Sequence, residues 1–214
     1  MAEVLDSTYA NLRQAVSLLV NGHPVVFPTD TVYALGVPVN FISGIQKIFS
    51  IKRRPQINAL PILLGESRDV DLVACDIPDV ARQIMHELWP GALTIVLKKK
   101  PFVPDIVTAG LPTVGVRLAN HPTTIDIIKW VDVPVVGTSA NLHGQPNPTT
   151  AQEAALQIGD EVKLIIDGGT TLSGVESTII DMSVDNPRIL RRGAVPQDVL
   201  GKYCKFEETS PVCL

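Results

Sequence analysis

Two pairs of polar residues, each pair spaced by one position, are the side chains of this sequence best suited to binding phosphate. Lys52 and Arg54 form one pair, and Ser139 and Asn141 form the other. Both pairs fall where a predicted helix or strand gives way to a loop. A lysine supplies a point charge and an arginine a planar fork, while the hydroxyl and amide bind neighbouring oxygens. Together the pairs would form a polyphosphate site without a glycine-rich P-loop.

Each pair also has a simpler structural interpretation. Lys52 and Arg54 precede Pro55 in the last turn of a predicted helix, where cations interact favourably with the helix dipole and usually stay solvated. Ser139 and Asn141 begin a turn-rich loop that either binds an anion through its backbone amides or simply connects two elements. The position of this second pair directly after a buried strand favours a site.

Four further segments place polar side chains beside predicted strands. Thr31 follows a buried strand, either as a ligand contact or within a turn stabilised by Asp30. Arg117 lies in a short apolar strand, so its guanidinium needs a partner, which is either a carboxylate of the protein or a bound anion. Ser177 begins a strand and is placed to face a cleft. Arg191 ends a strand, where it either contacts phosphate or base or stays solvated.

Short helices and strands that mix throughout the chain must position these residues. Apolar periodicity and capping residues predict helices at 8–20, 43–51, 66–74, 78–88, 122–130 and 151–158. Short apolar runs predict strands at 25–27, 59–64, 93–97, 114–118, 133–137, 164–166, 177–181 and 189–190. Strands follow strands near 93–118 and 164–192, so we predict an α/β fold with a mixed parallel and antiparallel sheet and covering helices.

Composition predicts a single domain and argues against several functional classes. The chain has 214 residues, 45% of them apolar, and a net charge of −4, so bulk charge does not favour nucleic-acid binding. Scattered cysteines and the absence of an apolar run of about 20 residues predict a cytoplasmic protein without membrane contact. We assign residues 1–200 to the domain and 201–214 to a C-terminal tail. The P-loop, dinucleotide-binding, nucleophile-elbow and clustered metal-ligand motifs are all missing from the sequence.

Taken together, the segments resemble the YrdC family of threonylcarbamoyl-AMP synthases over about residues 8–198. Many short motifs in one order carry this resemblance, which makes it far more specific than any single motif. They are PTDTVYALG (28–36), KRRP (52–55) with Asn58, WPGALTIVL (89–97), TVGVR (113–117) with HP (121–122), TSAN (138–141), GQPNPT (144–149), IIDGG (165–169), ESTIID (176–181) and ILRRGAV (189–195). The resemblance implies a catalytic domain with a twisted sheet bent around an open concave cavity.

The resemblance also implies a reaction. Members of this family are nucleotidyltransferases that join L-threonine, bicarbonate or CO2, and ATP into threonylcarbamoyl-AMP, releasing pyrophosphate. A partner transferase then passes the threonylcarbamoyl group to adenosine 37 of tRNA. Magnesium is expected as a cofactor bound through the ATP phosphates, with no metal site made of protein side chains. Weak contact with tRNA or double-stranded RNA is a further expectation.

Roles for individual residues follow from the matched motifs. The family's K-x-R and S-x-N signature corresponds to the expected catalytic residues Lys52, Arg54, Ser139 and Asn141. Positions expected to contact ATP are Lys52, Arg54, Asn58, Thr113, Asn141, Thr149 and Arg191. Positions expected to contact L-threonine are Thr31, Arg117, Ser139 and Ser177.

The chain departs from the family pattern at three positions, and two other activities compete with the synthase. Ala34, Leu63 and Arg192 stand where the family usually has glycine, a polar side chain and proline. Ala34 matches a sister group that keeps the fold and loses the signature residues, whereas this chain retains them. One competing function is a YrdC-like RNA-binding module without synthase activity. The other is carbamoyl-adenylate chemistry of hydrogenase-maturation proteins, whose acylphosphatase and zinc-finger segments are missing here.

Overall fold

The computed structural model describes residues 1–208, and the strands among them form one mixed sheet. The strands are β1 (Glu3–Asp6), β2 (Val25–Phe27), β3 (Ala34–Pro38), β4 (Ile62–Leu63), β5 (Ala74–Cys75), β6 (Leu93–Lys99), β7 (Thr113–Arg117), β8 (Val135–Ser139), β9 (Leu164–Asp167), β10 (Thr178–Asp181), β11 (Arg188–Arg191) and β12 (Glu207–Glu208). The helices are α1 (Tyr9–Leu19), α2 (Ile42–Lys52), the 3-10 turn η1 (Ser67–Asp69), α3 (Val70–Val73), α4 (Asp79–Leu88), α5 (Asp105–Thr108), α6 (Pro122–Val131), α7 (Ala151–Ile158) and α8 (Gln197–Leu200).

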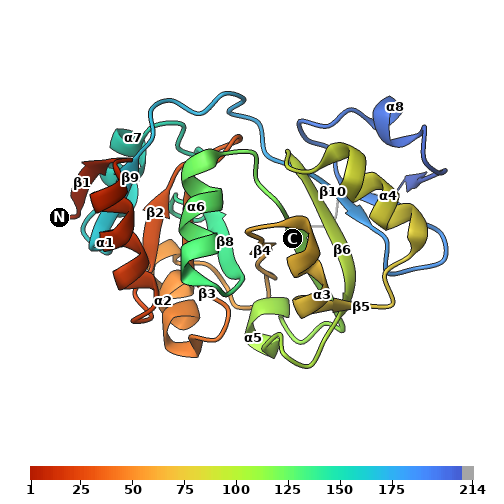
Figure 1. Cartoon of the computed structure of the whole chain (residues 1–214), viewed down its shortest axis with the longest axis horizontal. Helices are drawn as coiled ribbons and strands as arrows, with labels where there is room; N and C mark the ends of the chain where they lie inside the picture. Colours follow the sequence, from red (N-terminus) through yellow and green to blue (C-terminus); the bar gives the residue numbers. More distant parts are fainter. Residues whose placement is uncertain (209–214) are drawn as a thin grey trace.

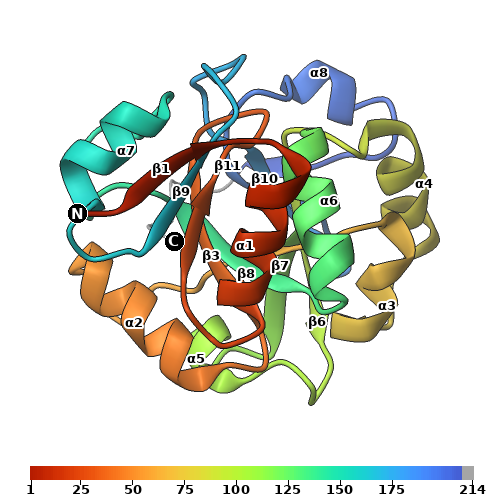
Figure 2. The ribbon, with the colours of Figure 1, turned by 60° about the vertical axis from the view of Figure 1, so that its left-hand side comes forward.

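The strand order is β1-β9-β2-β3-β8-β4-β7-β6-β10-β11-β12, and β5 adds to β6 beside this path. The pairs β1–β9, β2–β9, β4–β7, β6–β10 and β11–β12 are parallel, and the remaining pairs are antiparallel. The predicted mixed α/β sheet is therefore confirmed. Figure 2 shows β1 and β9 at one edge with α7 beside them.

Helices pack on the sheet through one apolar stripe each. In α1, the buried residues Leu12, Ala15, Val16 and Leu19 recur at helical spacing and pack in one cluster with Ile127 and other residues of α6. Figure 1 shows α1 and α6 side by side over the left half of the sheet, with α3 and α4 over the right. No helix within the described part of the chain is long and apolar enough to cross a membrane.

Several elements differ from the prediction for local reasons. The predicted strand at 59–64 shrinks to β4, because Pro61 has no N–H to contribute to a ladder. The predicted helix at 66–74 divides into η1 and α3. Strand β3 was not predicted, since Gly36 and Pro38 are poor strand formers, yet it lies between β2 and β8. Strand β1 was missed because it is short and mostly exposed.

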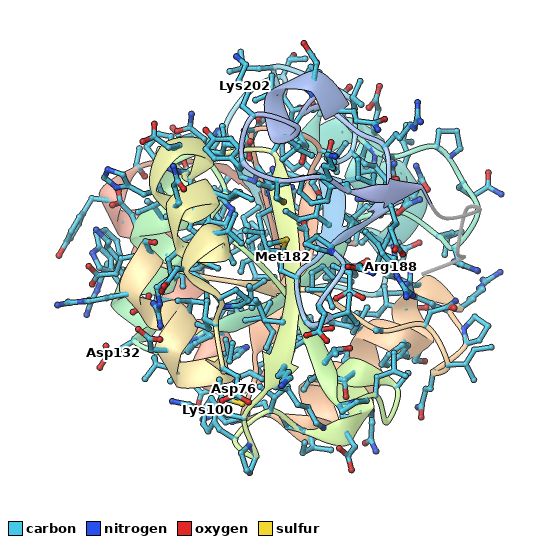
Figure 3. The ribbon with its side chains drawn as sticks, turned by 90° about the vertical axis from the view of Figure 1, so that its right-hand side faces the viewer. Asp76, Lys100, Asp132, Met182, Arg188 and Lys202 are labelled. Atoms are coloured by element: carbon cyan, nitrogen blue, oxygen red, sulfur yellow. The ribbon has the colours of Figure 1, made fainter. Side chains whose placement is uncertain are left out.

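The described start of the predicted tail packs against the domain. Tyr203, Cys204 and Phe206 contact the core, and β12 runs parallel to β11 with Glu207 opposite Arg188. Figure 3 shows this end of the sheet from the side, with Met182 just past β10 and Arg188 on β11. Residues 209–214, including Cys213, lie outside the described residues, so the predicted boundary at 200 stays a prediction.

A threonine at the start of β10 fixes the chain that follows β11. Thr178 Oγ1 donates to the carbonyl of Val195 (2.7 Å) and accepts from the N–H groups of Gly193 (3.1 Å) and Val195 (3.0 Å). Gly193 lies so close that a Cβ there would stand 2.4 Å from the carbonyl oxygen of Glu176. These contacts fix the backbone of residues 176–178, of which Glu176 and Ser177 line the cavity described below.

We expect Thr178→Val to lower the free energy of unfolding by about 1–3 kcal/mol, because the isosteric valine leaves buried backbone groups without partners. Urea denaturation measures the change. Thr171→Val is the matched control, since the buried Oγ1 of Thr171 has no partner within the described part of the chain and its loss should cost little. Equal stability of the two variants would contradict the assigned role of Thr178.

Candidate functional site

A cavity of about 550 Å³ lies on one face of the sheet, and alternate residues of the central strands line it. Successive side chains of a strand point to opposite faces, so Thr94 and Val96 of β6 line the cavity while Leu93 and Ile95 are buried in the core. The same alternation applies along β7 and β10. Residues of these strands, namely Thr113, Gly115, Arg117, Ile179 and Asp181, form the lining together with residues of β3, β4, β8, β11 and of the connecting loops, among them Ser177. The expected concave cavity is confirmed.

The two polar pairs of the sequence meet at one wall of this cavity. The Lys52 ammonium donates to the carbonyl oxygens of Ser139 (2.5 Å) and Asn141 (2.8 Å) and to Asn141 Oδ1 (2.9 Å). Ser139 Oγ also donates to Asn141 Oδ1 (2.6 Å), and Asn141 Nδ2 donates to the carbonyl of Gln145 (2.6 Å). Ser139 and Arg54 line the cavity, with Lys52 directly behind Ser139.

The structure excludes the simpler interpretation of Lys52 as a solvated cation at a helix end. The last turn of a helix favours a solvated cation, but Lys52 has an exposed fraction of only 1%. The turn 139–141 covers it, and its three acceptors match the three N–H groups of an ammonium. Helix α2 ends here because Arg53 adopts the left-handed conformation (φ 51°), which turns the chain before Arg54.

Arg54 and Arg191 bring two guanidinium groups to the lining. Arg54 Nη2 donates to the carbonyl of Ala59 (3.2 Å), while its buried Nε has no hydrogen-bond partner among residues 1–208. Arg191 donates through Nε and Nη2 to the carbonyl of Ser177 (3.1 and 2.9 Å), and its Nη1 lies 2.8 Å from Glu176 Oε2. Burial lowers the pKa of both guanidinium groups, so the cavity holds positive charge that is poorly solvated.

Arg117 is the centre of a second polar cluster. Its Nη2 lies 2.5 Å from Asp30 Oδ1, its Nη1 donates to Thr31 Oγ1 (3.0 Å), and its Nε donates to the carbonyl of Gly91 (3.0 Å). The sequence left open whether Arg117 pairs with a carboxylate of the protein or with a bound anion. In the structure its partner is the Asp30 carboxylate. Asp30 also accepts from the N–H of Asn120, so it joins the loop before β3 to the loop after β7.

The Ser177 hydroxyl joins Arg191 of β11 to Thr94 of β6. Its hydroxyl is 2.8 Å from Thr94 Oγ1 and accepts from Arg191 Nη2 (3.2 Å). Sequence reasoning missed Thr94, Glu176 and Asp181 as lining residues. The alternation of side chains along ESTIID would have identified Asp181, because it stands at even spacing from Ser177 on the same strand face.

The predicted site residues fall into three groups. Thr31, Arg54, Thr113, Arg117, Ser139, Ser177 and Arg191 line the cavity. Lys52 and Asn141 lie behind the lining and bond to Ser139. Asn58 and Thr149 are outside the lining, and Thr149 donates to Glu153 through its N–H (2.7 Å) and its hydroxyl (3.0 Å). Within residues 1–208, no group of three or more His, Cys, Asp or Glu side chains is arranged to hold a metal ion.

The pKa of Lys52 is lowered to about 7, mainly by burial and also by the nearby Arg54 charge, while the Glu176 carboxylate opposes this shift. In the unfolded chain the same group keeps its ordinary pKa of 10.5. Between these two values the unfolded chain binds more protons than the folded chain. The contribution of Lys52 to stability therefore increases as the pH rises through this window.

Known proteins resemble both the sequence and the fold. The Sua5/YciO/YrdC family model, described as telomere recombination, matches residues 17–193. The threonylcarbamoyl-AMP synthase of Pyrococcus abyssi (strain GE5 / Orsay) is 38% identical over 191 residues, covering 89% of this chain and 56% of that protein. The threonylcarbamoyl-AMP synthase of Bacillus subtilis (strain 168) is 35% identical over 199 residues, covering 92% of this chain and 58% of that protein. The chain thus spans a little more than half the length of these two relatives.

A solved structure shows the same likeness in three dimensions. P. abyssi Sua5 complexed with L-threonine superposes on this chain with a TM-score of 0.93 and 34% sequence identity. The superposition covers 96% of this chain and 63% of the other. The shared fold therefore extends over nearly all of the present chain.

We expect wild-type protein to gain stability relative to Lys52→Met as the pH rises from about 7 toward 10.5, by at most about 1.4 kcal/mol per pH unit. Urea denaturation at a series of pH values measures the difference. The same substitution at Lys47, exposed on the same helix, should give a profile parallel to wild type. Parallel profiles for wild type and Lys52→Met would contradict the buried, easily deprotonated lysine.

Proposed function

This chain belongs to the Sua5/YciO/YrdC family, and from that premise we propose that it is an L-threonylcarbamoyladenylate synthase. The earlier resemblance to the YrdC family is thereby confirmed. The observation that carries the proposal is the meeting of Lys52 and Arg54 with Ser139 and Asn141 at one wall of a single cavity. Similarity to two curated threonylcarbamoyl-AMP synthases supports the same reaction.

The cation-rich wall suits the triphosphate of ATP. Arg54 and Arg191 both line the cavity, and the free Nε of Arg54 has its hydrogen-bonding capacity available for a phosphate oxygen. In its protonated form Lys52 uses its three N–H groups within the protein, so it adds charge from behind the wall. Through Asn141 Oδ1, which also accepts from Ser139 Oγ, it helps to hold the Ser139 hydroxyl at the surface. Thr113 extends the polar lining along β7. We assign Asn58 and Thr149, which lie outside the lining, to contacts made as ATP binds.

The Arg117 cluster suits L-threonine. Asp30 holds the guanidinium in place, and Thr31 and Ser177 present hydroxyl groups nearby. A fixed, poorly solvated cation can bind the carboxylate of an amino acid, while the hydroxyl groups orient its amine and side chain. The relative solved in complex with L-threonine has nearly the same fold and supports this assignment.

The proposed reaction needs positioning and charge neutralisation rather than a covalent intermediate. The threonine amine adds to bicarbonate with loss of water, and an oxygen of the resulting carbamate attacks the α-phosphorus of ATP. The bond from that phosphorus to the bridging oxygen breaks, and pyrophosphate leaves with the electron pair. Arg54 and Arg191 stabilise the developing negative charge, and the cavity walls limit the access of water to the product.

We propose that magnesium enters with ATP rather than residing on the protein. Among the described lining residues, Glu176 and Asp181 are the carboxylates, and they form no three-ligand group. This donor set fits an ion held by phosphate oxygens and water, which is the coordination that Mg²⁺ favours in nucleotide complexes. When bound, the ion would neutralise phosphate charge. The product would pass in the cytoplasm to a separate transferase that modifies tRNA.

We expect pyrophosphate release from ATP to require both L-threonine and bicarbonate. Purified protein is incubated with ATP, magnesium and bicarbonate, each common amino acid is added separately, and pyrophosphate is measured. Signal with threonine alone among the amino acids supports the synthase. RNA binding without any threonine-dependent pyrophosphate would instead favour a binding module and overturn the proposal.

We expect Arg54→Asn to reduce the threonine-dependent rate by about a hundredfold, because one charged contact to the developing anion is lost. Arg53→Asn is the matched control, since Arg53 is exposed and asparagine tolerates its left-handed conformation. Circular dichroism must show that both variants are folded. Equal rates in the two variants would remove Arg54 from the site.

A further inference from the structure

Glu176 places a negative charge inside the cation-rich part of the cavity. It precedes Ser177 on the loop between β9 and β10, and its side chain lines the cavity. Its Oε2 lies 2.8 Å from Arg191 Nη1, and the side chain remains 40% exposed. A partly exposed ion pair of this kind is weak enough to exchange one partner for another.

The influence of Glu176 extends beyond Arg191. Burial lowers the pKa of Lys52, Arg54 and Arg191, and in each case the Glu176 carboxylate opposes the shift. Glu176 is thus the acidic group shared by all three cations. Asp30 serves Arg117 instead, and the Asp181 carboxylate accepts from Ser183.

This arrangement conflicts with a bound polyphosphate. A phosphate beside Arg191 and Arg54 would bring further negative charge close to the Glu176 carboxylate, and like charges at such distances repel. Because the Glu176 side chain is partly exposed, it can turn away from Arg191 into solvent. Hydrogen bonds hold the backbone here, since the N–H of Gly174 donates to the carbonyl of Thr31 (3.0 Å) and the N–H of Ala194 to that of Glu176 (3.0 Å), so the proposed movement involves the Glu176 side chain alone.

We propose that Glu176 is a displaceable internal counter-anion, which occupies the cations when the site is empty and is exchanged for the phosphates of the nucleotide. This inference rests on the proposed function, because it assumes that the same cations bind a polyphosphate. After the reaction, the carboxylate competes with pyrophosphate for Arg191. The residue therefore sets the affinity for polyphosphate and favours release of the product.

Glu176→Gln tests the proposal, because the amide oxygen still accepts a hydrogen bond from Arg191 while the negative charge is lost. Isothermal titration with inorganic pyrophosphate, in buffer without divalent metal, should show binding about three- to tenfold tighter than wild type. The gain in pyrophosphate affinity should shrink as salt is added. The corresponding gain in affinity for AMP should be smaller, because AMP carries less charge than pyrophosphate. If Glu176 only stabilised the fold, its replacement would weaken pyrophosphate binding. Tighter binding by Glu176→Gln therefore distinguishes the counter-anion from a purely structural residue.

Two variants serve as controls. Glu161→Gln removes the same charge from an exposed site outside the cavity lining and should leave pyrophosphate affinity unchanged. Glu176→Asp keeps the charge and should bind pyrophosphate nearly as wild type does. If Glu176→Gln folds poorly, Glu176→Ala must show the tighter binding in its place.

The possible results are distinct. Unchanged or weaker binding of metal-free pyrophosphate by Glu176→Gln, with normal binding by wild type, overturns the counter-anion while leaving the proposed function intact. A loss of affinity seen only with magnesium would identify Glu176 as a metal ligand and also overturn the proposal. If wild type and variants bind neither pyrophosphate nor ATP, both the proposed function and this inference fail.

Discussion

The burial of the Lys52 ammonium under the turn 139–141 is the interaction on which the rest of the site depends. Its three hydrogen bonds join the end of α2 to the end of β8, two segments far apart in the sequence. A buried ammonium is unfavourable unless its N–H groups are satisfied, so the lysine fixes the turn and the turn makes burial of the lysine tolerable. The Ser139 hydroxyl is held at the cavity wall as a result.

The cavity concentrates positive charge that the protein itself only partly neutralises. Arg117 has a close carboxylate partner in Asp30, whereas Arg54 relies on a carbonyl contact and the more distant Glu176. Such a surface is costly when empty and becomes favourable when an anion arrives. Arg117 is fully paired, whereas Arg54 and Arg191 are less completely neutralised, and this division is consistent with the proposed binding of an amino acid at one end of the cavity and of phosphates at the other.

Local patterns predicted much of the fold, and contacts between distant segments account for what they missed. Helix α1 was predicted because its apolar residues repeat at helical spacing, and α7 because Thr150 caps it by accepting from the N–H of Glu153 (3.2 Å). Strand β3 was missed because its stability comes from pairing with β8 rather than from its own residues. The residue types and the order of the motifs along the chain predicted that Lys52 and Arg54 would meet Ser139 and Asn141. They could not predict that Lys52 is buried, since a solvated helix end has the same sequence pattern.

The pairing of β6 with β10 has a consequence for the growing polypeptide. Residues 93–96 pair in parallel with residues 178–181, so β6 keeps an unpaired edge until most of the chain has left the ribosome. Ser177 and Arg191 also belong to this late segment, so a nascent chain that stops before it lacks their part of the cavity lining. Ligand binding therefore cannot assist the earlier steps of folding, and during synthesis this edge must be protected from pairing with other chains.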